Sequence, residues 1–181
     1  MMGRTRLGLA IAVVSALLLP ALPAWAGIPQ GRYAIGDSVM LGARTQLIAR
    51  GFRVNAEVSR QFRDAPHLVH NLAIGGHLPV DLIVHLGTNG LLEGADCDAL
   101  IRAAGPDRHV YLVTIKVPRS YRDPNNARLR ACAHRHANAS IVDWYGYSRY
   151  HVAWFYNDGY HLTPAGRQVY AAFLDRSVRS G

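Results

Sequence analysis

The chain has 181 residues, a formal net charge of +8 and a composition in which half of the residues are hydrophobic. These values exclude a disordered or collagen-like chain. All basic residues except Lys116 are arginines, and they are dispersed without a run, so we expect no nucleic-acid partner. A basic surface most often serves solubility, although it can also attract anionic wall polymers or lipid headgroups.

The first 26 residues are predicted to be a signal peptide. Two arginines precede an almost wholly apolar stretch, residues 7–19, and Ala24-Trp25-Ala26 has the small residues of a cleavage site. Cleavage after Ala26 leaves one domain, residues 27–181, in a secreted or periplasmic protein with no remaining membrane span. An uncleaved anchor is the alternative, because the apolar stretch approaches spanning length, but its prolines fit the end of a signal peptide better. We expect a monomer.

Strands alternate with helices in the remaining chain. Short apolar runs predict five strands, at residues 33–35, 52–58, 80–86, 109–115 and 140–143. Helices are expected after Ser38 up to Gly51, from Asp64 to Gly75, at 96–104, at 124–137, and after Thr163 and Pro164 as N-cap and first residue. Such alternation implies an α/β fold, a three-layer α/β/α sandwich with a five-stranded parallel sheet.

Ser38 lies where the first strand turns into a helix. Its backbone N–H is free to donate there, and the positive end of the helix dipole favours negative charge on a bound group. The ordinary interpretation is that Asp37 or Ser38 only caps the helix. We expect Asp37 to orient the loop, because the residue before Ser38 points elsewhere.

The loop before the last helix supplies the partners that a serine nucleophile requires. A serine hydroxyl needs a base within hydrogen-bond reach, and a carboxylate usually orients that base. Asp158 and His161, three residues apart, can provide both. Asn89 follows the third strand, and its side-chain amide suits an oxyanion hole.

The motifs "GDSV", "GTNG" and "DGYHL" occur in this order, and in them the chain resembles the SGNH (GDSL) hydrolase superfamily, most of all the extracytoplasmic SGNH domains attached to membrane O-acyltransferases. The resemblance implies a flavodoxin-like SGNH fold, with Ser38 as nucleophile, His161 as base, Asp158 as its orienter and Asn89 as oxyanion donor. Ser59 stands where the family has an oxyanion glycine, so its backbone N–H is a further candidate. No cofactor and no metal are implied.

Two function classes follow from this resemblance. The first is an exported serine esterase that hydrolyses or transfers short acyl groups, with acetyl esters on surface or cell-wall glycans as substrates and an O-acetyltransferase to a polysaccharide as one form. The second is a catalytically silent glycan-binding module. The intact serine, asparagine, aspartate and histidine favour the enzyme.

Cys97 and Cys132 form an even count in an exported chain and are expected to form a disulfide, with two buried free thiols as the alternative. His85 lies within an apolar strand and is expected in the core. His134 and His136 are spaced poorly for a metal. Seven aromatic residues crowd positions 144–156, and we expect two or three of their rings to line the site while the others fill the core.

Overall fold

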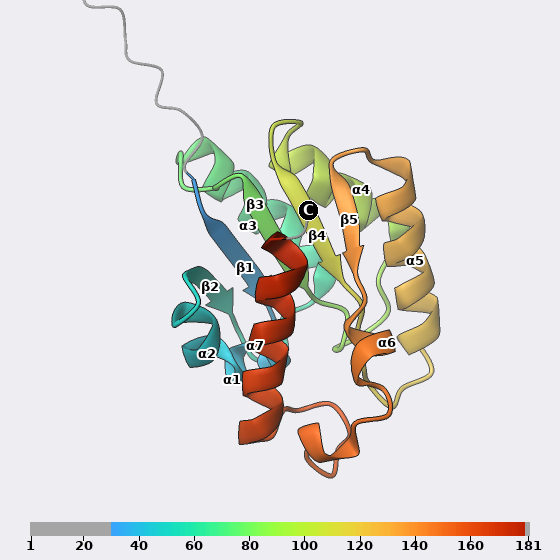
Figure 1. The fold of residues 1–181 in the computed structure, drawn as a ribbon. Helices are drawn as coiled ribbons and strands as arrows, with labels where there is room; N and C mark the ends of the chain where they lie inside the picture. Colours follow the sequence, from blue (N-terminus) through green and yellow to red (C-terminus); the bar gives the residue numbers. More distant parts are fainter. Residues whose placement is uncertain (1–29, 180–181) are drawn as a thin grey trace, which may run out of the picture.

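The computed structural model describes residues 30–179, in which five parallel strands form one sheet (Figure 1). The predicted signal peptide, residues 1–26, lies outside the described residues. The sheet has the spatial order β2-β1-β3-β4-β5. Its strands are β1 Arg32–Gly36, β2 Phe52–Ala56, β3 Asp81–His85, β4 His109–Val113 and β5 Ala139–Val142. The predicted α/β fold with a five-stranded parallel sheet is therefore confirmed.

Helices cover both faces of the sheet (Figure 1). One face is covered by α1 Ser38–Gly42, α2 Arg44–Ile48, α6 Trp144–Ser148 and α7 Pro164–Arg179. The other is covered by α3 Ala65–Ile74, α4 Gly94–Ala104 and α5 Arg122–Arg135. Two short 3-10 helices, Phe62–Asp64 and Val152–Trp154, lie in the connections. Within residues 30–179, no helix is long and apolar enough to cross a membrane.

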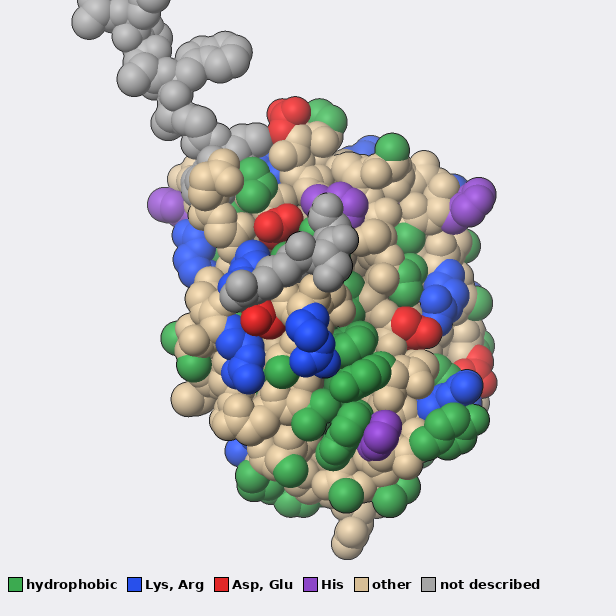
Figure 2. All heavy atoms as spheres, in the orientation of Figure 1, with side chains coloured by type: hydrophobic (Ala, Val, Ile, Leu, Met, Phe, Trp, Pro, Cys, Tyr) green, Lys and Arg blue, Asp and Glu red, His purple; other side chains and the backbone are tan. Residues whose placement is uncertain are grey.

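The strands divide their side chains between two hydrophobic cores. In β3, Ile83 packs under α7, whereas its neighbours Leu82 and Val84 pack under α3 and α4. Both kinds of position are buried, because helices cover both faces, and this explains why the strands read as continuous apolar runs. Figure 2 shows Lys and Arg side chains scattered over one face with acidic side chains among them, as the sequence predicted for the basic residues.

The helix predicted between Ser38 and Gly51 is in fact two short helices, α1 and α2. They are separated at Ala43, whose φ of −101° and ψ of 9° leave the α-helical region, and whose N–H bonds to Met40 O. Gly51, with φ of +83°, follows the end of α2. The prediction of one continuous helix was wrong, although Gly42, the last residue of α1, directly precedes the break and is a residue type that destabilises helix interiors.

A disulfide between Cys97 and Cys132 joins α4 to α5 on the same face of the sheet. The predicted pairing is therefore confirmed over the alternative of two free thiols. Both cysteines are fully buried in the core beneath these helices.

The strand order changes direction at β1. The chain leaves β1 for β2 on one side, and β3 lies on the other side, so the connections after β1 and β3 diverge. In open parallel sheets, ligands bind at such a point, outside the carboxyl ends of the strands. Ser38 follows β1, and Asn89 and Ser59 follow β3 and β2 respectively.

Candidate active site

Ser38 begins α1, and the preceding Asp37 fixes the turn from β1 into this helix. Asp37 Oδ1 accepts a hydrogen bond from Val39 N at 3.0 Å, and its other carboxylate oxygen accepts one from the hydroxyl of Thr88. Burial raises the pKa of Asp37, and the hydrogen bonds from Thr88 and Val39 oppose that rise. Asp37 thus orients the loop, as expected, and caps α1, which leaves the Ser38 hydroxyl half-buried with other partners.

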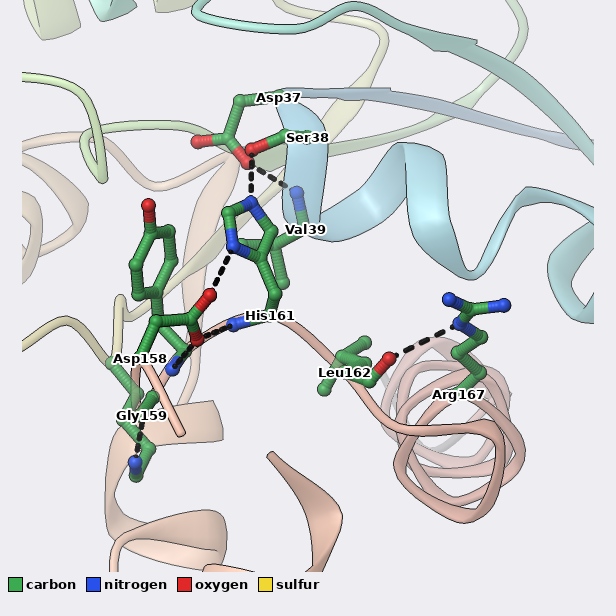
Figure 3. A network of polar contacts seen from close by, with 10 residues as sticks. Asp37, Ser38, Val39, Asp158, Gly159, His161, Leu162 and Arg167 are labelled. Carbon is green, nitrogen blue, oxygen red and sulfur yellow. Dashed lines mark hydrogen bonds and ion pairs between the residues drawn. The ribbon is translucent and has the colours of Figure 1, made fainter. Parts of the chain in front are cut away.

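His161 bridges the hydroxyl of Ser38 and the carboxylate of Asp158 (Figure 3). Its Nε2 lies 2.9 Å from Ser38 Oγ, and its Nδ1 lies 2.7 Å from Asp158 Oδ2. These three residues come from the two ends of the described chain, since 123 positions separate Ser38 from His161. The sequence predicted this set, and the structure brings all three side chains together.

Asp158 is held by its own loop. Its Oδ1 accepts hydrogen bonds from the backbone N–H groups of Tyr160 and His161, each at 3.0 Å. Partial burial raises the pKa of Asp158, but the hydrogen bonds from Tyr160 N and from the His161 ring and backbone outweigh it, so the pKa lies below its ordinary value. The carboxylate is therefore ionised at neutral pH and can stabilise a positive charge on His161.

Lys116 anchors this loop from the end of β4. Its ammonium group donates a hydrogen bond to Gly159 O and lies 3.8 Å from the centre of the Phe155 ring. Burial lowers the pKa of Lys116; the nearby Arg122 lowers it further, and Asp158 opposes the change. Sequence reasoning missed this contact, because nothing local links position 116 to a loop 43 residues away.

Asn89 and Ser59 lie in the two loops beside Ser38. Asn89 Nδ2 donates to Arg60 O at 3.3 Å, so its amide spans the loops after β3 and β2. Ser59 is exposed, and its φ of +61° is the only positive φ of a non-glycine residue among residues 30–179. Glycine adopts this conformation more readily than serine, which fits the glycine that the sequence resemblance expects there.

Two adjacent buried asparagines in the first turn of α5 hold the loops after β3 and β4. Asn125 Nδ2 donates to Gly87 O and Gly90 O at 2.9 and 2.8 Å, and Asn125 Oδ1 accepts from Leu92 N at 2.8 Å. Asn126 makes the equivalent pair of bonds to Ile115 N and O, at 2.8 and 3.0 Å. Sequence reasoning missed both residues, although paired asparagines within a predicted helix are an available signal, because asparagine is a poor helix former.

Arg60 ties the ends of β1 and β2 together. It is 8% exposed, and its guanidinium donates to Gly36 O at 3.2 Å and to Asn55 O at 2.7 Å. A further bond reaches Glu57 Oε2 at 3.0 Å. Arg60, the residue after Ser59, therefore holds the ends of β1 and β2 together beside the candidate oxyanion loop.

A cavity of about 420 Å³ opens beside Ser38 and His161. Its walls are largely apolar, and one cationic side chain, that of Arg167, stands among them. The lining residues are Ser38, Leu41, Gly42, Val58, Tyr156, Asp158, His161, Leu162 and Arg167. Tyr156 is the one ring of the aromatic run 144–156 in this wall, so the expectation of two or three was wrong. Trp144 and Phe155 are buried beneath α7 instead, because the chain needs large side chains to fill that core.

His85 lies in the core, as the sequence predicted. It is fully buried on β3, and its Nδ1 lies 2.7 Å from the Tyr170 hydroxyl. Burial lowers the pKa of His85 to about 3, so the ring is neutral at physiological pH.

One group of side chains in residues 30–179 has the spacing of metal ligands. Asp98, Cys132 and His136 bring their ligand atoms within 4.8 Å of one another. Cys132, however, is bonded to Cys97, and the Asp98 carboxylate lies 2.8 Å from Arg135 Nη2 and from His136 Nε2. A disulfide sulfur is not a thiolate, so this group is an ion-pair cluster at the end of α5.

Known proteins are similar to this chain in sequence and in fold. No protein-family model matches the chain. The peptidoglycan O-acetyltransferase OatA of Listeria monocytogenes is 34% identical over 143 residues, which are 78% of this chain and 23% of that protein. The chain thus spans about a quarter of this curated relative.

Solved structures match over most of the chain. The C-terminal catalytic domain of peptidoglycan O-acetyltransferase A from Streptococcus pneumoniae, solved with a methylsulfonyl adduct, superposes with a TM-score of 0.77 and 26% identity, covering 85% of this chain and 95% of that one. A GDSL-like lipase from Bacteroides thetaiotaomicron has a TM-score of 0.65 and 15% identity, covering 82% and 87%, and shows the shared fold. This chain is therefore a homologue of one segment of the peptidoglycan O-acetyltransferases and has the fold of the SGNH (GDSL) hydrolases.

Proposed function

We propose that this domain is an exported serine esterase or acyltransferase that cleaves short acyl esters, with acetyl esters of cell-wall glycans as the substrate class. The observation that carries the proposal is the continuous contact from Asp158 through His161 to the Ser38 hydroxyl, at 2.7 and 2.9 Å. An activated serine at the mouth of an open cavity is the arrangement that acyl transfer requires. The acetyl group and the cell-wall glycan are inferred from the names of the similar peptidoglycan O-acetyltransferases.

The first half of the reaction forms an acyl-enzyme. His161 Nε2 removes the proton from Ser38 Oγ while that oxygen attacks the ester carbonyl carbon. The tetrahedral intermediate collapses as the carbon–oxygen bond to the alcohol breaks, and His161 gives the proton to the departing oxygen. Asp158 stays ionised, holds the imidazole in the tautomer with the proton on Nδ1, and stabilises the transient imidazolium.

The second half releases the acyl group. Water or a sugar hydroxyl enters beside His161 Nε2, loses its proton to that nitrogen and attacks the acyl-enzyme carbonyl. Collapse returns the proton to Ser38 Oγ. Hydrolysis and transfer therefore differ only in which hydroxyl occupies this position, and the same residues serve both.

The negative charge on the carbonyl oxygen needs donors that are already in place. Ser38 N–H at the start of α1 and the Asn89 amide are the two proposed donors, and Ser59 N–H is a third. The Asn89 contact with Arg60 O, at 3.3 Å, is long for an N–H···O bond, so reorientation of this amide toward a substrate oxygen sacrifices little.

The test is covalent labelling together with turnover. A fluorophosphonate probe should label the wild-type protein on Ser38, and 4-nitrophenyl acetate should be hydrolysed with release of acetate. Ser38→Ala should abolish both signals while its thermal transition stays close to that of the wild type. A folded wild-type protein that neither reacts with the probe nor releases acetate would show a binding module instead. Addition of oligosaccharide acceptors then separates the two enzymes, because only a transferase yields acetylated sugar.

A further inference from the structure

The wall of the Ser38 cavity contains one arginine with unused hydrogen-bonding capacity. Arg167 is half-buried on α7, and its Nε donates to Leu162 O at 3.1 Å. In Figure 3, the side chain rises from α7, and its two terminal nitrogens lie beyond Nε, away from the helix axis. No ion pair within residues 30–179 joins Arg167 to a carboxylate. The outer edge of the guanidinium is thus available to a ligand.

The position of Arg167 is unfavourable for the helix that carries it. α7 begins at Pro164, and Thr163 caps it: the Thr163 hydroxyl accepts from Gly166 N at 3.2 Å and Thr163 O accepts from Arg167 N at 2.9 Å. Arg167 therefore lies in the first turn, where the positive end of the helix dipole repels a cation. Apolar side chains of Leu41 and Leu162 share its cavity and offer this charge no compensation. Because a cation at this position stabilises the fold little, binding of an anionic ligand is the simplest explanation for Arg167.

The cavity lies on the side of Ser38 where the alcohol portion of an ester has to bind. His161 and Asp158 line it, whereas the candidate oxyanion residue Asn89 does not. In acyl transfer the alcohol oxygen must approach His161 Nε2, because this nitrogen exchanges its proton with the alcohol. A group of the alcohol beyond that oxygen therefore extends along the cavity toward Arg167.

We propose that Arg167 selects esters whose alcohol portion bears a carboxylate, such as an acidic sugar; this inference rests on the proposed function. The planar guanidinium presents parallel N–H groups that match the two oxygens of a carboxylate. Low polarity of much of the surrounding wall strengthens such a pair, and Arg167 is the one permanently cationic side chain in the cavity, whereas the Asp158 carboxylate is engaged by His161 and by two backbone N–H groups.

The test compares two acetyl esters that differ only in charge, 4-acetoxybenzoate and 4-acetoxybenzamide. The wild-type enzyme should prefer the carboxylate by kcat/KM, chiefly through a lower KM. Arg167→Gln should reduce this preference by roughly 10- to 100-fold, the range of a charged hydrogen-bonded pair. Arg102→Gln, an equal change of charge on the exposed side of α4 across the sheet, should leave the preference intact. Added salt should weaken the wild-type preference.

Other outcomes would overturn the inference in distinguishable ways. If Arg167→Gln lowered kcat/KM for both esters equally, the preference for the carboxylate would persist, and Arg167 would only tether Leu162. A wild-type preference for the 4-nitrophenyl monoester of succinic acid over 4-nitrophenyl acetate, with none between the first two esters, would place the carboxylate on the acyl side. A wild-type enzyme that cleaves both esters equally well refutes the role of Arg167 alone, whereas one that cleaves neither refutes the proposed function.

Discussion

Two histidines in this molecule contact hydroxyl groups in similar ways but occupy opposite environments. His161 lies 2.9 Å from the Ser38 hydroxyl, and His85 lies 2.7 Å from the Tyr170 hydroxyl. The His161 side chain is 34% exposed and has a carboxylate on its second nitrogen, whereas His85 is 0% exposed and its second nitrogen has no partner. A short contact to a hydroxyl is thus common to both.

The difference lies in what happens when each ring gains a proton. At His161, the proposed base, the Asp158 carboxylate lies 2.7 Å from Nδ1, where it would stabilise an imidazolium, and a cavity opens beside Ser38. On His85, burial opposes the charge and lowers the pKa to about 3, so that ring cannot accept a proton near neutral pH. Access and a charged partner, rather than proximity to a hydroxyl, therefore mark the residue that can act as a base.

The largest expected effect is the loss of activity when the His161 side chain is removed. His161→Ala should lower kcat for 4-nitrophenyl acetate by roughly 10⁴-fold or more, because the proton of Ser38 then has no acceptor. The Ser38→Ala, His161→Ala double variant should be hardly worse than either single variant, since the two residues act on one proton transfer. Additive losses would show that they do not act as a unit.

Asp158→Asn should be nearly as damaging, with a loss in kcat of about 10³- to 10⁴-fold. The amide can donate to His161 Nδ1 and so favour the tautomer with the proton on Nε2, which cannot accept one from Ser38. Measurement of kcat beside a thermal unfolding curve separates this effect from unfolding. Retention of most activity would mean that a different group orients the base.

Substitution of the proposed oxyanion donors Asn89 and Ser59 should lower kcat less than the changes above, and the two losses should differ. Asn89→Ala should lower kcat roughly 10²- to 10³-fold with little change in KM, because charge on the carbonyl oxygen develops in the transition state. Ser59→Gly should cost less than about tenfold, because its backbone N–H remains and glycine accepts the observed φ of +61°. If Asn89→Ala were fully active, the amide would have no part in the mechanism.

The smallest effect appears in stability rather than in activity. The pKa of His85 is about 6.5 in the unfolded chain and about 3 in the fold. Acidification between these two values therefore favours unfolding. The free energy of unfolding should fall by up to about 1.4 kcal/mol per pH unit between pH 6 and 4. Asp37 has a raised pKa, so its protonation on acidification favours the folded state and opposes the effect of His85.

His85→Leu provides the matched comparison for this window. Denaturant titrations at several pH values should show a flatter pH dependence in His85→Leu than in the wild type, whatever the variant's absolute stability. An unchanged slope would mean that the buried ring is not the source of the acid sensitivity.

Local patterns predicted the parts of the molecule that depend on short stretches of chain. Apolar runs identified all five strands, and the motifs identified Ser38, Asp158 and His161, whose side chains meet in the structure. Asn89 lies after β3, as its motif predicted, and contacts Arg60. The point at which one helix ends and the next begins was harder to predict. The break at Ala43 directly follows Gly42, but a single glycine does not show by itself whether a helix ends there. In the structure α1 contacts both β1 and β2, whereas α2 contacts chiefly β2.

The supporting contacts could not be predicted because their partners are distant in sequence. Asn125 bonds to carbonyl groups 35 and 38 residues away, and Lys116 reaches 43 residues to Gly159. No periodicity encodes such pairs. In the aromatic run, the choice of Tyr156 for the cavity depends on how α6 and α7 fill the core, and composition alone does not specify it.

The anchoring of the Asp158 loop by Lys116 has a practical consequence, because Lys116 is the only lysine in the 181-residue chain. Amine-directed reagents have this one side chain as their target besides the terminal amine. Its lowered pKa increases the fraction of reactive free amine at moderately alkaline pH. A fluorophore or isotopic methyl group installed there would report, from a single defined position, when the loop that carries Asp158 and His161 moves.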